Sequence, residues 1–296
     1  MIYEQTEKVS LSQAVKAKTL AYVQLLKLRL SLLVALSAVF GYAIAAGSEW
    51  TAYGLFAIGL GGLMITGASN ALNQLFEKEL DALMKRTALR PIPTGRISSK
   101  GALIFALLLS VSGVAVIGRF FNLPAALLGV IGLLSYAFVY TPMKRVSPAS
   151  VFIGAIPGGL PPLIGWVAFT GSIDAGGLIL FVIQFLWQFP HFWAIAWLLD
   201  EDYQRAGFKM LPSVQGKTTF SALMILIYTL SLIPVVVFPV QAGLIGWSSA
   251  GVLALLGVVF CWPAWKLYRT MEAVHARKLM FASFMYLPLA QLVFLF

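Results

Sequence analysis

The sequence predicts an all-α integral membrane protein with nine transmembrane helices. Hydrophobic residues make up 60% of its 296 residues and charged residues only 11%, with a mean hydropathy of +0.88. A soluble domain is about a quarter charged. The apolar residues also fall in runs that are long enough to cross a bilayer, and the charged residues fall between them. These observations exclude a soluble globular protein.

Nine apolar runs mark the expected spans, in chain order. They cover residues 28–47, 53–73, 101–118, 123–140, 150–170, 176–198, 220–240, 247–266 and 279–296. The fifth run is the weakest because it is rich in glycine and proline, and its Gly154–Trp166 stretch favours a broken or kinked helix that lines a cavity.

The basic residues give the orientation. Of the 21 Lys and Arg residues, 20 lie in the N-terminal segment or in connections that would share one side of the membrane, and only Arg119 lies on the other. Because cytoplasmic loops retain Lys and Arg, that side is expected to be cytoplasmic. The N-terminus would then lie inside, and nine spans would place Phe296 outside. The net charge of +10 therefore indicates membrane topology and contact with anionic lipid rather than nucleic-acid binding.

The chain reads as one membrane domain behind a short lead-in. Residues 1–27 contain Glu4 and Glu7 and lack the apolar core of a signal peptide, so we expect a cytoplasmic or interfacial segment. Residues 28–296 form the nine-helix domain, with no linker inside it. The single Cys261 excludes an intrachain disulfide and a multi-cysteine metal site.

A first group of polar residues ends the second span. Asn73, Glu77 and Asp81 are spaced i, i+4 and i+8, which places them on one helix face. Two carboxylates and an amide oxygen suit Mg²⁺, which completes its shell with substrate phosphate and water. The other interpretation is a solvated helix end, but polar residues at membrane depth are costly and usually functional.

Cations suited to phosphate follow directly. Arg86 and Arg90 lie in a stretch that Pro91, Pro93 and Gly95 stiffen into a loop. Arginine holds phosphate oxygens through a bidentate fork. The other interpretation is that these arginines only enforce topology.

A second acidic group follows the sixth span. Asp200, Glu201 and Asp202 would bind a second divalent cation beside phosphate. Two acidic groups facing one cavity would clamp a diphosphate through metal ions and neutralise it as a leaving group.

The sixth span also carries His191 and an aromatic run. His191 is either a hydrogen-bonded structural histidine or a residue that binds the acceptor molecule or transfers protons. The aromatic residues are either ordinary packing or a wall that stabilises an allylic cation. They are Phe185, Trp187, Phe189, Phe192, Trp193 and Trp197. At the end of the fourth span, Tyr140, Lys144 and Arg145 reach the same inner surface.

Together these stretches resemble the UbiA superfamily of intramembrane prenyltransferases, and in particular its haem-modifying branch. The resemblance runs from Lys27 to the last span. Its most specific parts are 68–96, 140–166, 187–212 and 277–288. Within them, the run Trp187–Phe192 is unlike the branches that modify quinones.

The resemblance implies nine helices around a central cavity and Mg²⁺-assisted ionisation of a prenyl diphosphate. In the haem branch the donor is farnesyl diphosphate and the acceptor is a vinyl group of protohaem IX (haem b). The vinyl carbon attacks the farnesyl cation, water adds, and the product is haem O. A downstream haem A synthase or terminal oxidase assembly is the expected partner, beside the lipid bilayer itself.

Residue by residue, the resemblance assigns expected roles. Asn73, Glu77 and Asp81 match the first acidic motif, and Asp202 with Glu201 matches the second, so these five are the expected metal ligands. Arg86, Arg90 and Lys144 match diphosphate-binding positions. For the acceptor we expect His191, Trp187 and Tyr140. Two departures stand out: Glu77 replaces the usual Asp, and Ala206 occupies the later acidic position of the second motif.

Two other functions are compatible with these patterns. One is a prenyltransferase of the same superfamily that acts on a quinone or phenolic acceptor. The other is a transporter or haem-binding assembly factor, but its site is expected near the bilayer midplane, whereas the acidic groups here lie at one face. The acid-containing N-terminus favours a bacterial plasma (inner) membrane with the active site toward the cytoplasm.

Overall fold

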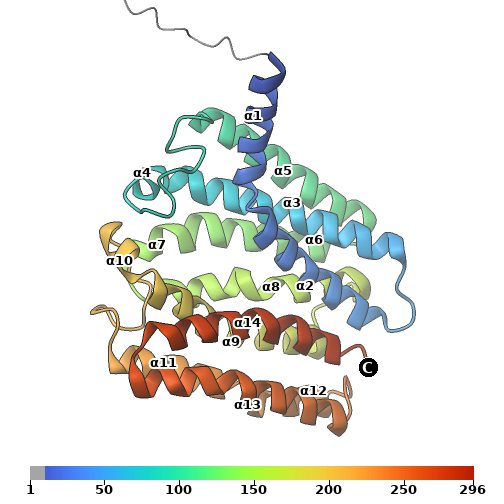
Figure 1. The fold of residues 1–296 in the computed structure, drawn as a ribbon. Helices are drawn as coiled ribbons and strands as arrows, with labels where there is room; N and C mark the ends of the chain where they lie inside the picture. Colours follow the sequence, from blue (N-terminus) through green and yellow to red (C-terminus); the bar gives the residue numbers. More distant parts are fainter. Residues whose placement is uncertain (1–10) are drawn as a thin grey trace, which may run out of the picture.

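The protein is a bundle of long helices in a computed structural model that describes residues 11–296 (Figure 1). Residues 1–10, with Glu4, Glu7 and the counted cation Lys8, lie outside the described residues. The first part of the bundle comprises α1 (Leu11–Leu25), α2 (Leu28–Ala46), α3 (Ala52–Phe76), α4 (Lys78–Asp81), α5 (Ser99–Phe120), α6 (Leu123–Leu134), the π-helix η1 (Ser135–Tyr140), α7 (Thr141–Val146) and α8 (Ser150–Thr170). The second comprises α9 (Ala175–Leu198), α10 (Asp200–Arg205), α11 (Thr219–Leu230), the 3₁₀-helix η2 (Pro234–Val236), α12 (Val237–Gln241), α13 (Trp247–Thr270) and α14 (Ala273–Val293).

Eight segments of the described chain are long and apolar enough to cross a membrane. They are 28–46, 52–76, 99–120, 123–146, 150–170, 175–198, 219–241 and 247–270. Each coincides with one of the first eight predicted runs, so the all-helical membrane class is confirmed. The ninth run folds as α14, which begins earlier than predicted and includes Arg277 and Lys278. The ninth crossing and the placement of the two termini stay predictions.

The helix α8 lies between two hydrophobic cores. Its neighbours are α2, α6 and α9. Val151 and Ala155 belong to the core shared with α9–α14, whereas Leu160 and Leu163 belong to the core of α2–α6. The alternative of a broken helix is wrong, because α8 is helical throughout despite Pro157, Pro161 and Pro162, whereas the alternative of a kinked helix stays a prediction. The neighbouring helix α9 supplies side-chain donors to the Gly158 carbonyl, which Pro162 leaves without its backbone partner.

Two glycines explain how closely α2 approaches α8. A Cβ atom on Gly165 would collide with the Ala38 carbonyl oxygen, and one on Gly41 would collide with the Pro162 carbonyl oxygen. Small residues at such crossings let helix backbones come into contact, which is how membrane helices gain packing energy.

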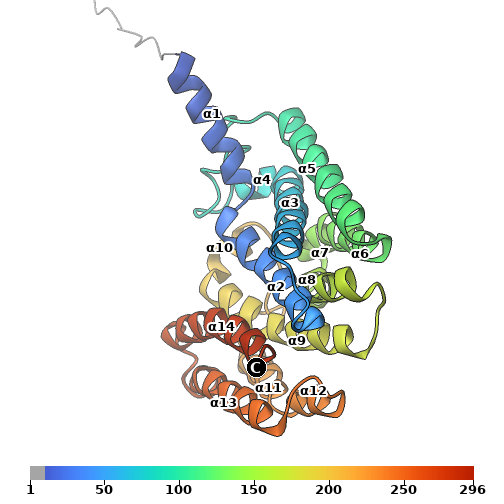
Figure 2. The ribbon, with the colours of Figure 1, turned by 90° about the vertical axis from the view of Figure 1, so that its right-hand side faces the viewer.

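The short elements gather at one end of the bundle. Figure 1 shows α4, α7 and α10 together at one end, whereas the C-terminal end of α14 lies at the other. Figure 2, turned by 90°, shows α1 projecting away from the bundle. The end that carries α4, α7 and α10 also holds the sequence-predicted polar residues.

Candidate active site

The first polar group is buried where α3 ends. The helix is interrupted at Glu77, which caps α3 with φ −98° and ψ 10°, so the continuous helix over residues 73–81 that the sequence suggests does not form. Two backbone hydrogen bonds still preserve the spacing: Glu77 N–H donates to the Asn73 carbonyl (3.0 Å) and Asp81 N–H to the Glu77 carbonyl (2.7 Å). Asn73, Glu77 and Asp81 are only 2%, 4% and 0% exposed.

Lys144 forms a buried ion pair with Glu77. Its Nζ lies 2.8 Å from Glu77 Oε1, and it also lies over the Tyr140 ring, 4.7 Å from the centroid. The π-helix η1 comes directly before α7, the short helix that carries Lys144. Such π segments recur at functional sites. The predicted diphosphate-binding lysine therefore reaches the first acidic motif.

Arg90 forms the second buried ion pair. Its NH1 atom donates to both carboxylate oxygens of Asp81, at 2.8 and 2.7 Å. The loop bends back to allow this contact, and the Thr87 hydroxyl secures the bend by donating to the Asp81 carbonyl (2.9 Å). Arg86, in contrast, is exposed and joins this part of the structure through its backbone.

Asp202 connects the second acidic motif to that loop. Its Oδ1 accepts from the Lys85 N–H (3.3 Å), its Oδ2 from the Arg86 N–H (3.4 Å), and Arg205 NH1 lies 3.2 Å from Oδ1. The Glu201 side chain is 86% exposed and pairs with Arg205 at 3.9 Å. The structure thus brings Asp202, but not Glu201, to the loop of the first motif.

Lys27 is a member of the site that sequence reasoning missed. Its Nζ donates to Asn73 Oδ1 (3.3 Å), while Asn73 Nδ2 donates to the Thr141 hydroxyl (3.3 Å). Burial of the amine, followed by the positive charges of Arg90 and Lys144, lowers the pKa of Lys27 to about 7. The sequence offered one signal, a lysine directly before the first span, but a lysine at that place is also typical of the basic residues that set membrane orientation.

The backbone at Lys27 adds to this evidence. Its φ of 47° and ψ of 53° lie in the left-handed region, which a non-glycine residue occupies at a cost. This conformation turns the chain from α1 into α2 at the polar end of the bundle.

These residues fit a magnesium ion that is completed by substrate. Within residues 11–296 no three His, Cys, Asp or Glu side chains form a ready-made metal cage. Mg²⁺ does not need one, because it is commonly held by one or two carboxylates together with substrate phosphates. Glu77 and Asp81 are buried oxygen donors of this kind, and each is neutralised by a cation that could equally bind phosphate.

A cavity opens beside Glu77. It has a volume of about 630 Å³, and its walls come from α3, α4, η1 and α7. Phe76 and Phe138, which line it, are 47% and 55% exposed. The lining residues are Phe76, Glu77, Leu80, Ala137, Phe138, Thr141, Pro142, Arg145 and Val146. Of the two buried acids, Glu77 therefore reaches this largely apolar opening.

The predicted acceptor residues separate into two places. Trp187 and His191 stack against each other on α9, with ring centroids 4.6 Å apart and planes at 15°. Both bind Ser283 on α14: Trp187 Nε1 donates to its carbonyl (2.9 Å), and His191 Nδ1 lies 2.8 Å from its hydroxyl. Tyr140 instead lies beneath Lys144 and next to Tyr136, on the diphosphate side.

The rest of the aromatic run divides between different surroundings. Phe189 and Trp193 pack against Phe152 and Tyr228 of neighbouring helices, at centroid distances of 4.5–6.2 Å. This is ordinary core packing, so the alternative of a continuous aromatic wall finds no support in these two residues.

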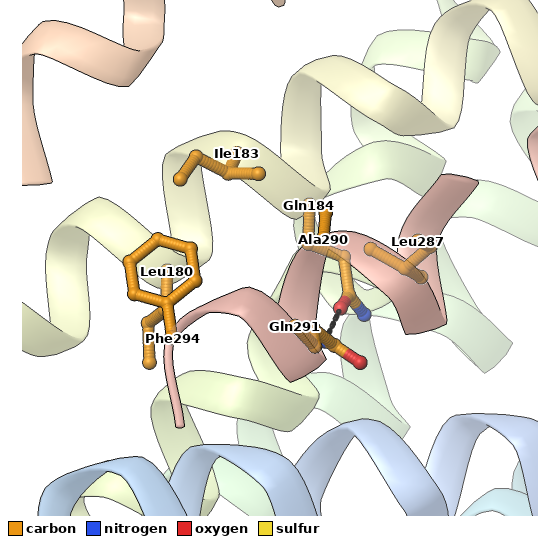
Figure 3. A pocket seen from close by; sticks show the side chains of 7 residues that line it. All are labelled: Leu180, Ile183, Gln184, Leu287, Ala290, Gln291 and Phe294. Atoms are coloured by element: carbon orange, nitrogen blue, oxygen red, sulfur yellow. Dashed lines mark hydrogen bonds between the residues drawn. The ribbon is translucent and has the colours of Figure 1, made fainter. Parts of the chain in front are cut away.

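A small void between α9 and α14 does not offer a binding site. Figure 3 shows Gln184 and Gln291 meeting beside it, with a hydrogen bond of 2.9 Å from Gln291 Nε2 to Gln184 Oε1. Its volume is about 10 Å³, no more than one water molecule needs. The two amides serve packing between helices in this region.

Known proteins share both the sequence and the fold. Residues 34–287 match the UbiA prenyltransferase family. A protein of Cytophaga hutchinsonii named protoheme IX farnesyltransferase is 45% identical over 276 residues, which cover 93% of this chain and 96% of that protein.

Solved structures agree with the helical arrangement. A structure described as digeranylgeranylglyceryl phosphate synthase in membranes superposes with a TM-score of 0.77 at 20% identity, covering 94% of this chain and 97% of that one. A UbiA homologue from Archaeoglobus fulgidus bound to GPP and Mg²⁺ gives 0.64 at 13% identity, covering 93% and 99%. The resemblance expected from the motifs is confirmed: this chain belongs to the UbiA prenyltransferase family.

Proposed function

We propose that the protein transfers a farnesyl group from farnesyl diphosphate to a vinyl group of haem b, with addition of water, to give haem O and diphosphate. The observation that carries this proposal is that two buried ion pairs lie at one end of a bundle of membrane helices. They are Glu77–Lys144 and Asp81–Arg90. The relative named protoheme IX farnesyltransferase supports the choice of donor and acceptor.

The cations of the site bind the diphosphate. Lys144 and Arg90 are held ready by carboxylates, and both can transfer their hydrogen bonds to phosphate oxygens without moving far. Lys27 adds a third cationic group, and Arg86 would contact the diphosphate from the exposed side of the loop. Preorganised charges of this kind stabilise a leaving group more strongly in a water-poor site than in water.

The carboxylates released by this exchange hold the metal. Glu77 and Asp81, with the amide oxygen of Asn73, would hold Mg²⁺, which when bound neutralises the departing diphosphate. A UbiA homologue whose structure contains Mg²⁺ and a prenyl diphosphate supports this use of the fold. Asp202, from the second motif, positions the loop through the N–H groups of Lys85 and Arg86 and would join the donor set when the metal binds. Glu201 would need to leave Arg205 and solvent to do so.

The chemistry requires an allylic cation that is kept from bulk water. The C–O bond of farnesyl diphosphate breaks and its electron pair leaves with diphosphate. The terminal vinyl carbon of the haem attacks the farnesyl cation, a water hydroxyl adds to the carbocation that results, and the remaining proton of that water is released. The apolar cavity beside Glu77 and the surrounding bilayer give the isoprenoid a path that excludes most water.

We propose that His191 and Trp187 seat the haem, since they present a polar ring nitrogen and a flat aromatic face on α9, the helix that leads into α10 and Asp202. Tyr140 would contact the substrates from the diphosphate side. The site would face the cytoplasm of a bacterial plasma membrane, and haem A synthase or terminal oxidase assembly would use the product.

A product assay tests this proposal. Purified protein in detergent is supplied with haem b, farnesyl diphosphate and Mg²⁺, and the haems are measured by mass spectrometry. A haem heavier by farnesyl plus water, lost on chelation and restored by Mg²⁺, is expected. A protein that leaves haem unchanged but prenylates a phenolic acid would belong instead to a quinone-type branch.

A further inference from the structure

His191 is held in one orientation by three aromatic neighbours and one hydroxyl. Its ring stacks on Trp187, Phe284 meets it edge-on at 5.1 Å, and Phe192 lies 5.6 Å away. The residue is 8% exposed, so the ring cannot turn freely. Ser283, on the facing helix α14, is fully buried and provides the only polar side-chain contact of the ring within the described chain.

The Ser283 hydroxyl has a single proton, and the geometry shows where it is used. Its Oγ lies 2.6 Å from the Met280 carbonyl oxygen, a distance that requires the hydroxyl to donate there. The 2.8 Å contact between Ser283 Oγ and His191 Nδ1 must then use a proton on Nδ1. The neutral imidazole is therefore the Nδ1–H tautomer, and its Nε2 has a free lone pair.

That lone pair is not occupied by the protein. In residues 11–296 Nε2 makes no hydrogen bond, and the unpartnered side-chain atoms sealed from solvent belong to Ser150, Trp166 and Trp193, not to His191. A neutral imidazole whose other nitrogen is oriented by a hydrogen bond is the usual form of a metal-ligating histidine.

We propose that Ser283 is a positioning residue which, through Met280, fixes His191 as the Nδ1–H tautomer and directs its Nε2 lone pair to the iron of the acceptor haem. This inference rests on the proposed function, because it assumes that haem is the acceptor. The ring stacked on Trp187 would then hold the macrocycle in one rotation, so that one vinyl group meets the donor.

Haem-binding spectra test the proposal. Ferric haem b is titrated into detergent-purified protein and followed by absorption and electron paramagnetic resonance. We expect a histidine-ligated spectrum for the wild type, which His191→Ala loses. Ser283→Ala is expected to bind haem about 10- to 100-fold more weakly with an altered ligand spectrum, the usual effect of removing the partner of a metal ligand. Ser283→Thr, which keeps the hydroxyl, is expected to restore both.

A double-mutant cycle and a metal-free probe separate positioning from packing. In the His191→Ala background, Ser283→Ala is expected to add no further loss, because its effect acts through the histidine. Metal-free protoporphyrin IX is expected to bind equally to the wild type and to Ser283→Ala, because it has no iron to ligate. Ser110→Ala is the matched control, since its hydroxyl also donates to a carbonyl of its own helix, that of Ala106, but has no histidine partner.

Several outcomes would overturn the proposal. One is an unchanged haem spectrum and affinity in Ser283→Ala. Another is a loss of metal-free porphyrin binding equal to that of haem, which would indicate a packing role. If the Ala variant does not fold, Ser283→Cys gives the same comparison with a side chain of similar size and a weak acceptor. If the wild type makes haem O and Ser283→Ala binds haem as the wild type does, only this inference is wrong. If the wild type makes no haem product, the proposed function is wrong.

Discussion

Lys144 Nζ lies 2.8 Å from Glu77 Oε1, and both side chains are about nine-tenths buried or more. The partners are 67 residues apart in the chain and come from α7 and from the end of α3. A buried pair of this kind contributes little net stability, because desolvation offsets the attraction, but loss of one partner leaves an uncompensated charge. Its burial is therefore better explained by function than by stability.

Glu77→Gln is expected to reduce turnover by about 10²-fold or more, because the amide cannot replace a carboxylate toward a metal. It is also expected to destabilise the fold, since Lys144 remains buried. The double variant Glu77→Gln with Lys144→Met should recover the melting temperature but not the activity. Near-normal turnover of a correctly inserted Glu77→Gln variant in the product assay would remove Glu77 from the metal site.

Arg90→Lys keeps the positive charge but loses the planar guanidinium that contacts both oxygens of Asp81. We expect the KM for farnesyl diphosphate to rise about tenfold or more, with a smaller change in the KM for haem. Arg119→Lys, at the opposite end of the α5 span, is the matched control and should change neither. Equal effects on both KM values would indicate a general loss of structure.

Asp202→Ala is expected to release the loop that carries Lys85 and Arg86, because the carboxylate accepts both of their backbone N–H groups. Limited digestion with trypsin should then cut after these residues faster than in the wild type. Asp202→Asn keeps one acceptor oxygen and should show less cleavage. If Asp202→Asn loses as much activity as Asp81→Asn with no change in cleavage, Asp202 acts through the metal and not through the loop.

The pKa of Lys27 gives a pH dependence with a definite sign. Burial lowers it from 10.5 to about 7, so between these values the unfolded chain binds more protons than the folded one, and stability rises with pH. Below about pH 7 the folded protein bears the full cost of the buried charge. Lys27→Met should therefore raise the melting temperature most near pH 6 and progressively less toward pH 10. Lys16→Met, at an exposed position on α1, controls for loss of one charge, and an equal gain at both pH values would contradict the assignment.

Gly165→Ala tests the crossing of α2 and α8. The new methyl group would meet the backbone carbonyl of Ala38, which cannot move aside as a side chain can. We expect a loss of about 1–3 kcal/mol or more in stability, the usual effect of overpacking a core. Gly251→Ala, where a methyl group meets nothing within 4 Å, is the control. Thermal unfolding in detergent compares the two, and equal melting temperatures would mean that the helices separate at little cost.

Patterns along the chain predicted the features that depend on residues close together in sequence. The apolar runs predicted nine spans because each helix must pair its own backbone within the bilayer, and eight of them coincide with helices long and apolar enough to cross it. The spacing of Asn73, Glu77 and Asp81 predicted a buried polar group, although not the break in the helix at Glu77. These features arise from residues that are neighbours in sequence.

Contacts between distant residues could not be predicted in the same way. Nothing near Lys27 signals that it will meet Asn73, and nothing in the Tyr140 segment signals a π-helix. The error on α8 has a related cause. Three prolines usually interrupt a helix, and only the facing helix shows why they do not.

That facing helix has a further consequence. Pro162 has no N–H to donate to the Gly158 carbonyl four residues earlier, and the amides of Gln184 and Gln188 donate to this oxygen instead, at 2.8 and 2.9 Å. The proline and the two glutamines therefore act as one structural unit. If another residue replaced Pro162, its own N–H would donate to the Gly158 carbonyl, and the amides of Gln184 and Gln188 would no longer be needed there. We therefore expect these three positions to change together among related sequences.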